Sequence, residues 1–140
     1  MQLTYLSSAA ILIKDQDSSI LCDPWFIDGE YYGSWCHYPP CTVKPEELNN
    51  VDGIYITHIH PDHFSIRTLE KMNKQIPIFI HKFHSDFLKR TIENLGFNVI
   101  EVEHDKRVNV KKNLNIRILA ADNCDPTLCF KYFGCGIAEK

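Results

Sequence analysis

The sequence predicts an α/β domain built on a mixed β-sheet. Its 140 residues are 44% hydrophobic and 24% charged, which is enough apolar material for one core and argues against disorder. Short apolar segments near the N-terminus are expected to pair with each other as strands. Later segments of strand and helix character alternate, which is the pattern of an α/β sheet. We therefore expect one domain over residues 1–140.

The first third of the chain predicts neighbouring strands followed by a long loop. Residues 2–6 and 9–13 have strand character, residues 15–19 form a polar turn cluster, and residues 20–22 begin the next strand. Residues 23–45 are rich in Pro, Gly, Trp and Tyr. A loop of this length inside a compact domain is usually functional.

After residue 50, predicted strands and helices alternate. The predicted strands are 53–57, 76–80, 98–102, 108–110 and 114–120, the last two forming a hairpin. One predicted helix covers 64–73, with Leu69 and Met72 on one face. A second begins at a Ser85 cap, keeps Leu88, Ile92 and Leu95 at helical spacing, and ends at Gly96.

Charge and hydropathy exclude several classes of partner. The formal net charge is -3 and no run of Lys or Arg occurs, so nucleic acid and membrane surfaces are not expected to bind. The longest apolar segments, 9–13 and 76–80, are too short to span a bilayer. No secretory signal is visible at the N-terminus, and we expect a cytoplasmic protein with a small-molecule substrate.

The six cysteines do not form a recognisable zinc knuckle. No Cys-x-x-Cys pair occurs, and the closest pairs, Cys36 with Cys41 and Cys124 with Cys129, are five residues apart. Without a secretory signal, we expect reduced thiols rather than disulfides.

The main chemical signal is the segment His58-Ile59-His60-Pro61-Asp62-His63. In extended backbone, side chains at i and i+2 share a face, so His58 and His60 can bind one ion together. Pro61 keeps His60 out of helical geometry, and Asp62 can start the next helix and turn His63 toward a second ion. Imidazole and carboxylate groups suit zinc, and also iron or manganese. The motif predicts one or two metal ions, most simply zinc.

An isolated histidine is usually structural or solvated. Three histidines and one aspartate within six residues, where a strand meets a helix, are hard to explain by packing alone. The other histidines lack such company, and we expect them to be ordinary surface or loop residues: His37, His81, His84 and His104.

Two segments resemble the metallo-β-lactamase superfamily. Residues 56–64 are similar to the metal motif of that superfamily, and residues 20–26 are similar to its second strand, which ends in Asp-Pro in one branch. That branch contains L-ascorbate-6-phosphate lactonase-like and CMP-N-acetylneuraminate hydroxylase-like proteins. The Asp-Pro-Trp sequence, the aromatic loop through Trp35, and residues 121–126 favour the hydroxylase-like side.

The resemblance implies an αββα sandwich, two sheets between helices with metals at one edge. The chain covers about the first half of that fold, so we expect an incomplete sandwich of one sheet plus helices. The family's bridging aspartate and last histidine would lie in the other half. Its third histidine for the first metal normally follows a strand at 115–120, where this chain has Asp122 and Asp125. Asp122 is the better substitute ligand, although an aspartate after a strand can also be a cap.

Two further features have alternative interpretations. Asp23 can start a turn, or it can lie beside the metal loop and orient a ligand histidine. The aromatic residues of the long loop can line a substrate mouth, or they can cover the edge of the sheet: Trp25, Tyr31, Tyr32, Trp35 and Tyr38.

Three functions are consistent with these residues. The first is a metal-dependent hydrolase that cleaves a small-molecule ester, lactone, amide or phosphate bond through a metal-bound hydroxide, with Asp62 holding the water and accepting its proton. The second is an iron-dependent protein related to sialic-acid hydroxylation, although no Rieske motif occurs in the chain. The third is a non-catalytic metal-binding half-domain.

The half-domain interpretation predicts association. A single sheet would leave an apolar inner face uncovered, formed by Ile11, Ile13, Ile54, Ile56 and Ile78. A last strand near 128–135 would present an open edge. A homodimer or a complementing chain would cover both, and the second metal, held only by Asp62 and His63, would bind weakly.

Overall fold

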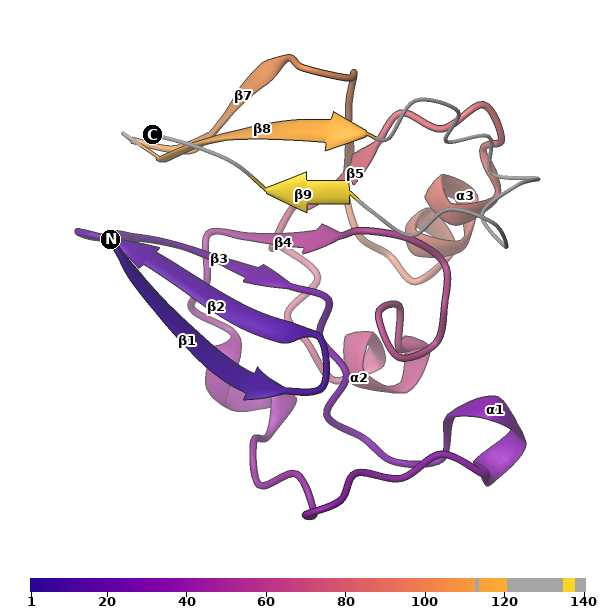
Figure 1. The fold of residues 1–140 in the computed structure, drawn as a ribbon. Coiled ribbons are helices and arrows are strands. Elements are labelled where there is room, and N and C mark those ends of the chain that lie inside the picture. The colour runs from indigo at the N-terminus through magenta and orange to yellow at the C-terminus, as the bar shows by residue number, and fades with distance from the viewer. Residues whose placement is uncertain (113, 121–134, 138–140) are drawn as a thin grey trace.

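The computed structural model describes residues 1–112, 114–120 and 135–137, and their strands form two sheets (Figure 1). One sheet has six strands in the order of the chain: β1 (Gln2–Ser7), β2 (Ala10–Asp15), β3 (Ser18–Cys22), β4 (Gly53–Ile56), β5 (Ile78–His81) and β6 (Val99–Val102). The other has three: β7 (Arg107–Lys111), β8 (Leu114–Ala120) and β9 (Cys135–Ile137). The strands predicted before residue 121 are all present, with ends that differ by one or two residues, whereas the strand predicted near 128–135 lies almost entirely outside the described residues.

The six-stranded sheet is mixed, as expected. The β1–β2 and β2–β3 pairs are antiparallel, whereas β3, β4, β5 and β6 run parallel. As a result, β1 and β3 to β6 all end at the same edge of the sheet. Parallel strands need crossover connections, and the crossovers here include α2 (Ile66–Glu70) and α3 (Phe87–Asn94). Two short elements, α1 (Glu30–Gly33) and the 3₁₀ turn η1 (Pro45–Leu48), lie between β3 and β4.

Both predicted helices exist, but each begins later than predicted. The helix expected over 64–73 is confined to Ile66–Glu70, because the Ser65 hydroxyl accepts a hydrogen bond from the Thr68 amide and caps the helix there. Residues before this cap form a turn, in which the amide of Phe64 donates to the carbonyl of His60. The N-cap position of α3 is Asp86, one residue later than expected, and the Ser85 hydroxyl accepts a hydrogen bond from the Phe87 amide at 3.2 Å. Gly96, with a φ of 89°, ends this helix as expected.

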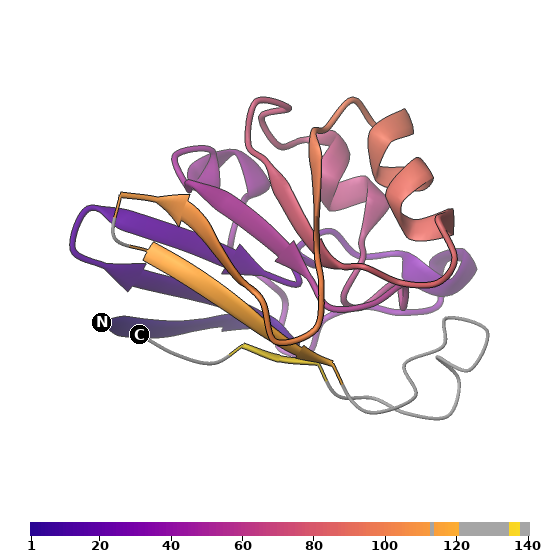
Figure 2. The same cartoon turned by 90° about the horizontal axis from the view of Figure 1, so that it is seen from above.

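The two faces of the large sheet have different covers (Figure 2). Helices α2 and α3 pack on one face, where the core includes Ile54, Ile56 and Ile78. The three-stranded sheet packs on the other face, where Ile116 and Ile118 of β8 contact the second core. That second core contains Ile20, Cys22, Tyr55, Phe79 and Val102.

This arrangement confirms the α/β sandwich and corrects two details. The expectation of one sheet plus helices is wrong, because the β7–β8 hairpin folds back over β3 to β6 and starts a second sheet. The five isoleucines that were expected to form one uncovered face lie on two different faces of the sheet. Ile54, Ile56 and Ile78 lie under the helices and are fully buried, whereas Ile11 and Ile13 face the second sheet and are half-buried. The sequence pattern does not separate the two sides of the sheet, because both faces of a parallel strand such as β4 are apolar and buried.

Within the described part of the chain, every helix is too short to cross a lipid bilayer.

Candidate metal centre

The motif residues lie in the loop that follows β4, at the edge where the parallel strands end. Extended backbone stops at Ile56, and the amides of His63 and Phe64 both donate to the carbonyl of His60, at 2.9 and 2.7 Å. This turn brings Asp62 and His63 back toward His58. The predicted helix start at Asp62 is therefore replaced by a turn, and α2 begins after Ser65.

The structure brings the predicted ligand side chains together. The ring centroids of His58 and His60 are 4.6 Å apart, and those of His58 and His63 are 4.1 Å apart. The Nε2 atom of His63 lies 3.5 Å from a carboxylate oxygen of Asp62. The His58 ring thus lies near both of the other histidine rings of the motif, and the Asp62 carboxylate lies near His63.

Asp23 holds this loop from outside the motif. It follows β3 in a left-handed conformation, with φ of 45°, which aspartate tolerates better than most residues. Its buried carboxylate accepts hydrogen bonds from the Thr57 amide, the Thr57 hydroxyl and Nδ1 of His63, each at 2.8 Å. Of the two interpretations of Asp23, the structure supports the one in which it orients a ligand histidine.

These hydrogen bonds assign the tautomers of two histidines. A carboxylate only accepts, so Nδ1 of His63 carries the hydrogen that Asp23 accepts. The Thr57 hydroxyl donates its one hydrogen to Asp23, so it accepts from Nδ1 of His58, at 2.9 Å. In both rings the remaining nitrogen, Nε2, is then the one with a lone pair for a metal. The sequence alone assigns Thr57 no separate role, although it stands directly before the first motif histidine.

The protonation states of His58 and His63 affect metal binding in opposite ways. Burial, followed by the neighbouring rings of His63 and His60, lowers the pKa of His58 to about 4, so the ring is neutral at pH 7. For His63, burial opposes charging, but the hydrogen bond to Asp23 and the charges of Asp23 and Asp62 raise its pKa. A metal must displace any proton on Nε2 of His63, whereas Asp23 keeps Nδ1 protonated.

The residues present fit a transition metal by donor type. Imidazole nitrogen with carboxylate oxygen is the donor set of zinc and non-haem iron sites. The side-chain rotamers are close but not convergent: among the described residues, no three His, Cys, Asp or Glu side chains surround one point as ligands of a single ion. The candidate ligands Asp122 and Asp125 lie outside the described residues.

Of the histidines expected to be surface or loop residues, His37 lies in the long loop with an enclosed side chain, and His81 is buried in β5. The His37 side chain is 6% exposed, lies 4.0 Å from the Trp25 ring, and bonds through Nδ1 to the Asp28 carboxylate. His81 ends β5, where its Nδ1 pairs with the Val102 carbonyl at 3.2 Å. Burial lowers the pKa of His81. The sequence offers no periodic signal for either placement, because both depend on contacts with distant strands or loops.

The long aromatic loop is tied to the helix that follows the metal loop. The Phe26 amide donates to the Thr68 hydroxyl at 3.0 Å, and the Ser65 hydroxyl donates to Glu30 at 2.7 Å. The aromatic residues of this loop differ in exposure: Trp25 is buried against the fold, whereas Tyr32 is fully exposed. The loop therefore borders the metal loop along the same edge.

Two curated relatives are similar to this chain in sequence. A provisionally named Rieske 2Fe-2S iron-sulfur protein of Mycolicibacterium smegmatis is 33% identical over 126 residues, which is 86% of this chain and 24% of that protein. The cytidine monophosphate-N-acetylneuraminic acid hydroxylase of Xenopus laevis is 38% identical over 87 residues, which is 59% of this chain and 15% of that protein. The chain thus spans about a quarter or less of these relatives.

Solved structures share the fold. A possible metal-dependent hydrolase from Veillonella parvula superposes with a TM-score of 0.67 and 20% identity, over 84% of this chain and 47% of that chain. Isothiocyanate hydrolase from Delia radicum gut bacteria superposes with a TM-score of 0.64 and 23% identity, over 84% of this chain and 46% of that chain.

The family follows from sequence and fold together. The profile described as "Beta-lactamase superfamily domain" matches residues 2–133, which is nearly the whole chain. The chain belongs to the β-lactamase superfamily and has the metallo-β-lactamase fold.

Proposed function

We propose that this protein is a metal-dependent hydrolase that acts on an ester, lactone, amide or phosphate bond of a small molecule. The observation that supports it is the network from Asp23 through Thr57 to His58 and His63, which orients two Nε2 lone pairs as ligands. A transition metal bound there would supply Lewis acidity and lower the pKa of a coordinated water.

The residues of the loop have distinct roles in this proposal. His58 and His60 would hold one metal, and His63 with Asp62 would complete the site, with Asp122 as a further candidate ligand. Asp62, whose carboxylate lies 3.5 Å from Nε2 of His63, would orient a water and accept its proton. Asp23 contacts no substrate and acts by positioning His63.

Metal content tests the site directly. Protein purified without added metal is expected to contain zinc, and His58→Ala or His60→Ala should each lower the bound metal to less than half. His84→Ala is the matched control, because His84 is an exposed histidine outside the loop. Elemental analysis of all four proteins measures the effect, and unchanged metal content in both loop variants would show that the site is wrong.

Turnover tests the role of Asp62. Asp62→Asn removes the proton acceptor and keeps the shape of the side chain, so the fold should be retained while kcat for ester or lactone hydrolysis falls about 100-fold or more. Circular dichroism checks the fold. A variant with the full hydrolytic rate would remove Asp62 from the proposed mechanism.

A second candidate is an iron-dependent oxygenation related to that of the hydroxylases. It is favoured by the relatives that are 33% and 38% identical, which carry iron–sulfur and hydroxylase names. Two histidines and one carboxylate also suit non-haem iron. Iron in place of zinc in the purified protein, together with turnover that requires oxygen, would favour this candidate over hydrolysis.

A further inference from the structure

A cavity of about 460 Å³ lies between the β1–β2 turn and the long aromatic loop. Residues 5–8, Trp25 and residues 36–42 line it. Ser7 is the last residue of β1, at the edge of the sheet where β4 ends and the metal loop begins. Trp25 is two residues beyond Asp23, which bonds to the metal loop. The cavity therefore lies toward the same edge of the large sheet as the metal loop.

The lining has a buried floor and an exposed aromatic rim. Trp25 and Ser7 are buried, at 6% and 8% exposure, and the His37 side chain is equally enclosed. Tyr5 and Tyr38 are 71% and 98% exposed, so these two phenol rings meet solvent at the mouth. A volume of this size is typical of a site for one small organic group.

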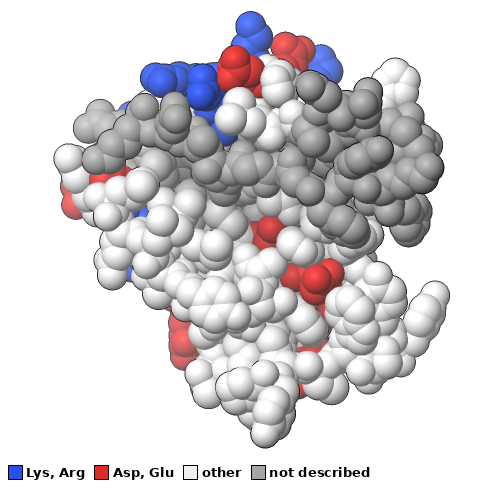
Figure 3. Space-filling view, viewed as in Figure 1, with Lys and Arg blue, Asp and Glu red and all other residues white. Residues whose placement is uncertain are grey.

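The lining carries no formal charge apart from the titratable His37. No Asp, Glu, Lys or Arg is among the lining residues, and hydroxyl groups supply the polar contacts. Figure 3 agrees with this: Lys and Arg side chains gather over β7 and β8, away from the aromatic loop. An anion in this cavity would lose hydration without gaining a lysine or arginine partner, which is costly.

Hydrogen bonds hold the aromatic floor in place before any ligand binds. The Trp25 indole N–H donates to the Ile27 carbonyl at 2.9 Å, and the His37 ring packs at a tilt against Trp25, with ring centroids 4.0 Å apart. Nδ1 of His37 bonds to Asp28, and its Nε2 lies 3.2 Å from the Trp25 carbonyl. The backbone amide of His37 also donates to Asp28, at 2.9 Å. A wall ordered in this way loses little entropy on binding.

We propose that this cavity binds an uncharged ring, aryl or glycosyl, that forms part of the substrate. Aromatic walls stack on the face of either ring, and Ser8 and Thr42 supply hydroxyls for its substituents. The placement of the linked scissile bond at the metal loop rests on the proposed hydrolase function. Binding of the ring itself does not.

Site-resolved NMR of the zinc-loaded chain tests the proposal. The probes are benzyl alcohol for the aryl ring, methyl glucoside for the glycosyl ring, and benzoate as the anionic match to benzyl alcohol. At least one neutral probe should shift the amides of residues 5–8, 36–38 and 41–42 and leave α3 unchanged. Whichever neutral probe binds identifies the ring. The cavity is not a ring site if neither neutral probe shifts these amides, or if benzoate shifts them at equal concentration.

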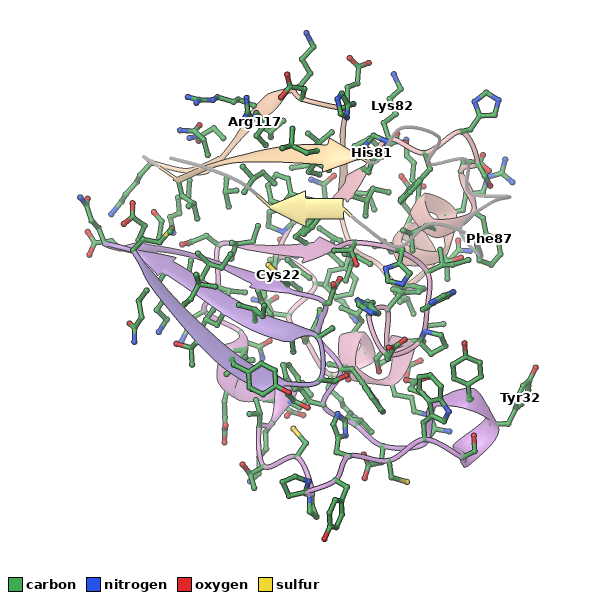
Figure 4. The ribbon with its side chains drawn as sticks, in the orientation of Figure 1. Cys22, Tyr32, His81, Lys82, Phe87 and Arg117 are labelled. Carbon is green, nitrogen blue, oxygen red and sulfur yellow. The ribbon has the colours of Figure 1, made fainter. Side chains whose placement is uncertain are left out.

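Variants separate the cavity from the rest of the loop. Tyr38→Ala removes one rim ring and should weaken binding of the neutral probe about tenfold. Tyr32→Ala is the matched control, since Tyr32 is absent from the lining and its side chain points away from the body of the protein (Figure 4). Thr42→Lys should add affinity for benzoate. Equal weakening by Tyr32→Ala and Tyr38→Ala would overturn the assignment.

The two proposals fail separately in these measurements. Amide shifts at the cavity in a protein without hydrolytic activity would retain the ring site and reject the hydrolase. If the protein hydrolyses a substrate, but neutral rings neither shift the cavity amides nor inhibit the reaction, the hydrolase is retained and the ring site is rejected.

Discussion

Asp23 is buried at 4% exposure and accepts three hydrogen bonds, two from Thr57 and one from His63. Burying a carboxylate is costly unless it is hydrogen-bonded, and these donors offset that cost. Because the donors belong to the metal loop, the same bonds that stabilise Asp23 also orient His58 and His63. Residues that orient ligands in this way typically change metal affinity 10–100-fold when they are replaced.

Asp23→Asn is expected to weaken metal binding about 10–100-fold without unfolding the protein. The amide lacks the negative charge, and its NH₂ group cannot accept from His63. The pKa of His63 should therefore fall, since the bond and the charge that raise it are both lost. Competition with a chromophoric chelator measures the affinity, and NMR titration of the metal-free protein measures the pKa.

Asp52→Asn is the matched control for this prediction. Asp52 is also a carboxylate that accepts a backbone amide, from Ser19 at 2.8 Å, and it pairs with Lys111. It lies at the other end of β3 and β4 from the metal loop. Equal loss of metal affinity in both variants would show that Asp23 acts through general stability.

At the scale of elements, strand β4 must fit closely under the second sheet. It begins at Gly53, where an added Cβ would lie 2.7 Å from the Phe79 ring and 3.1 Å from Val110 of β7. Phe79 is 1% exposed, so its ring has little room to move. The missing side chain thus lets β7 approach the large sheet, and β4 carries the metal loop at its far end.

Gly53→Ala is expected to destabilise the protein by about 1–3 kcal/mol, as overpacking in a closed core does. Urea unfolding with the metal removed by chelator measures the change. Phe79→Leu removes the atoms that the new Cβ meets, so the double variant should lose less stability than the sum of the single variants. Strict additivity would show that the clash with Phe79 does not limit this position.

At the scale of the whole molecule, burial decreases across the face under the second sheet. Ile20 of β3 is 1% exposed, Ile13 of β2 is half-buried, and their neighbour Leu3 on β1 is 60% exposed. The strand β1 also lies at the edge of the sheet. An apolar side chain on an open edge strand favours pairing with another chain.

We predict that this chain associates at micromolar concentration through β1, with a second copy as partner. Leu3→Lys should weaken the association at least about tenfold, because a charge on an edge strand opposes pairing. Phe87→Lys is the control, since Phe87 is 62% exposed on α3, away from this edge. Sedimentation velocity measures both variants. A wild-type monomer with two tightly held metals would contradict the prediction.

The sequence alone determined the features that depend on local pattern. The strands, the two helices and the His-x-His-x-Asp-His loop follow from hydropathy, turn residues and ligand spacing. Each of these signals involves residues only a few positions apart in the chain. The metallo-β-lactamase fold followed from the resemblance of residues 20–26 and 56–64, and the family profile confirmed it. Helix ends were less accurate, because a single cap such as Ser65 decides them.

Only the tertiary structure decided the long-range contacts. Asp23 and His63 are 40 positions apart, so their hydrogen bond depends on β3 pairing with β4 and not on any local pattern. The second sheet and the cavity beside Trp25 likewise join segments that are distant in the chain. Such contacts depend on how elements pack, and packing is a property of the folded core that residue spacing does not encode.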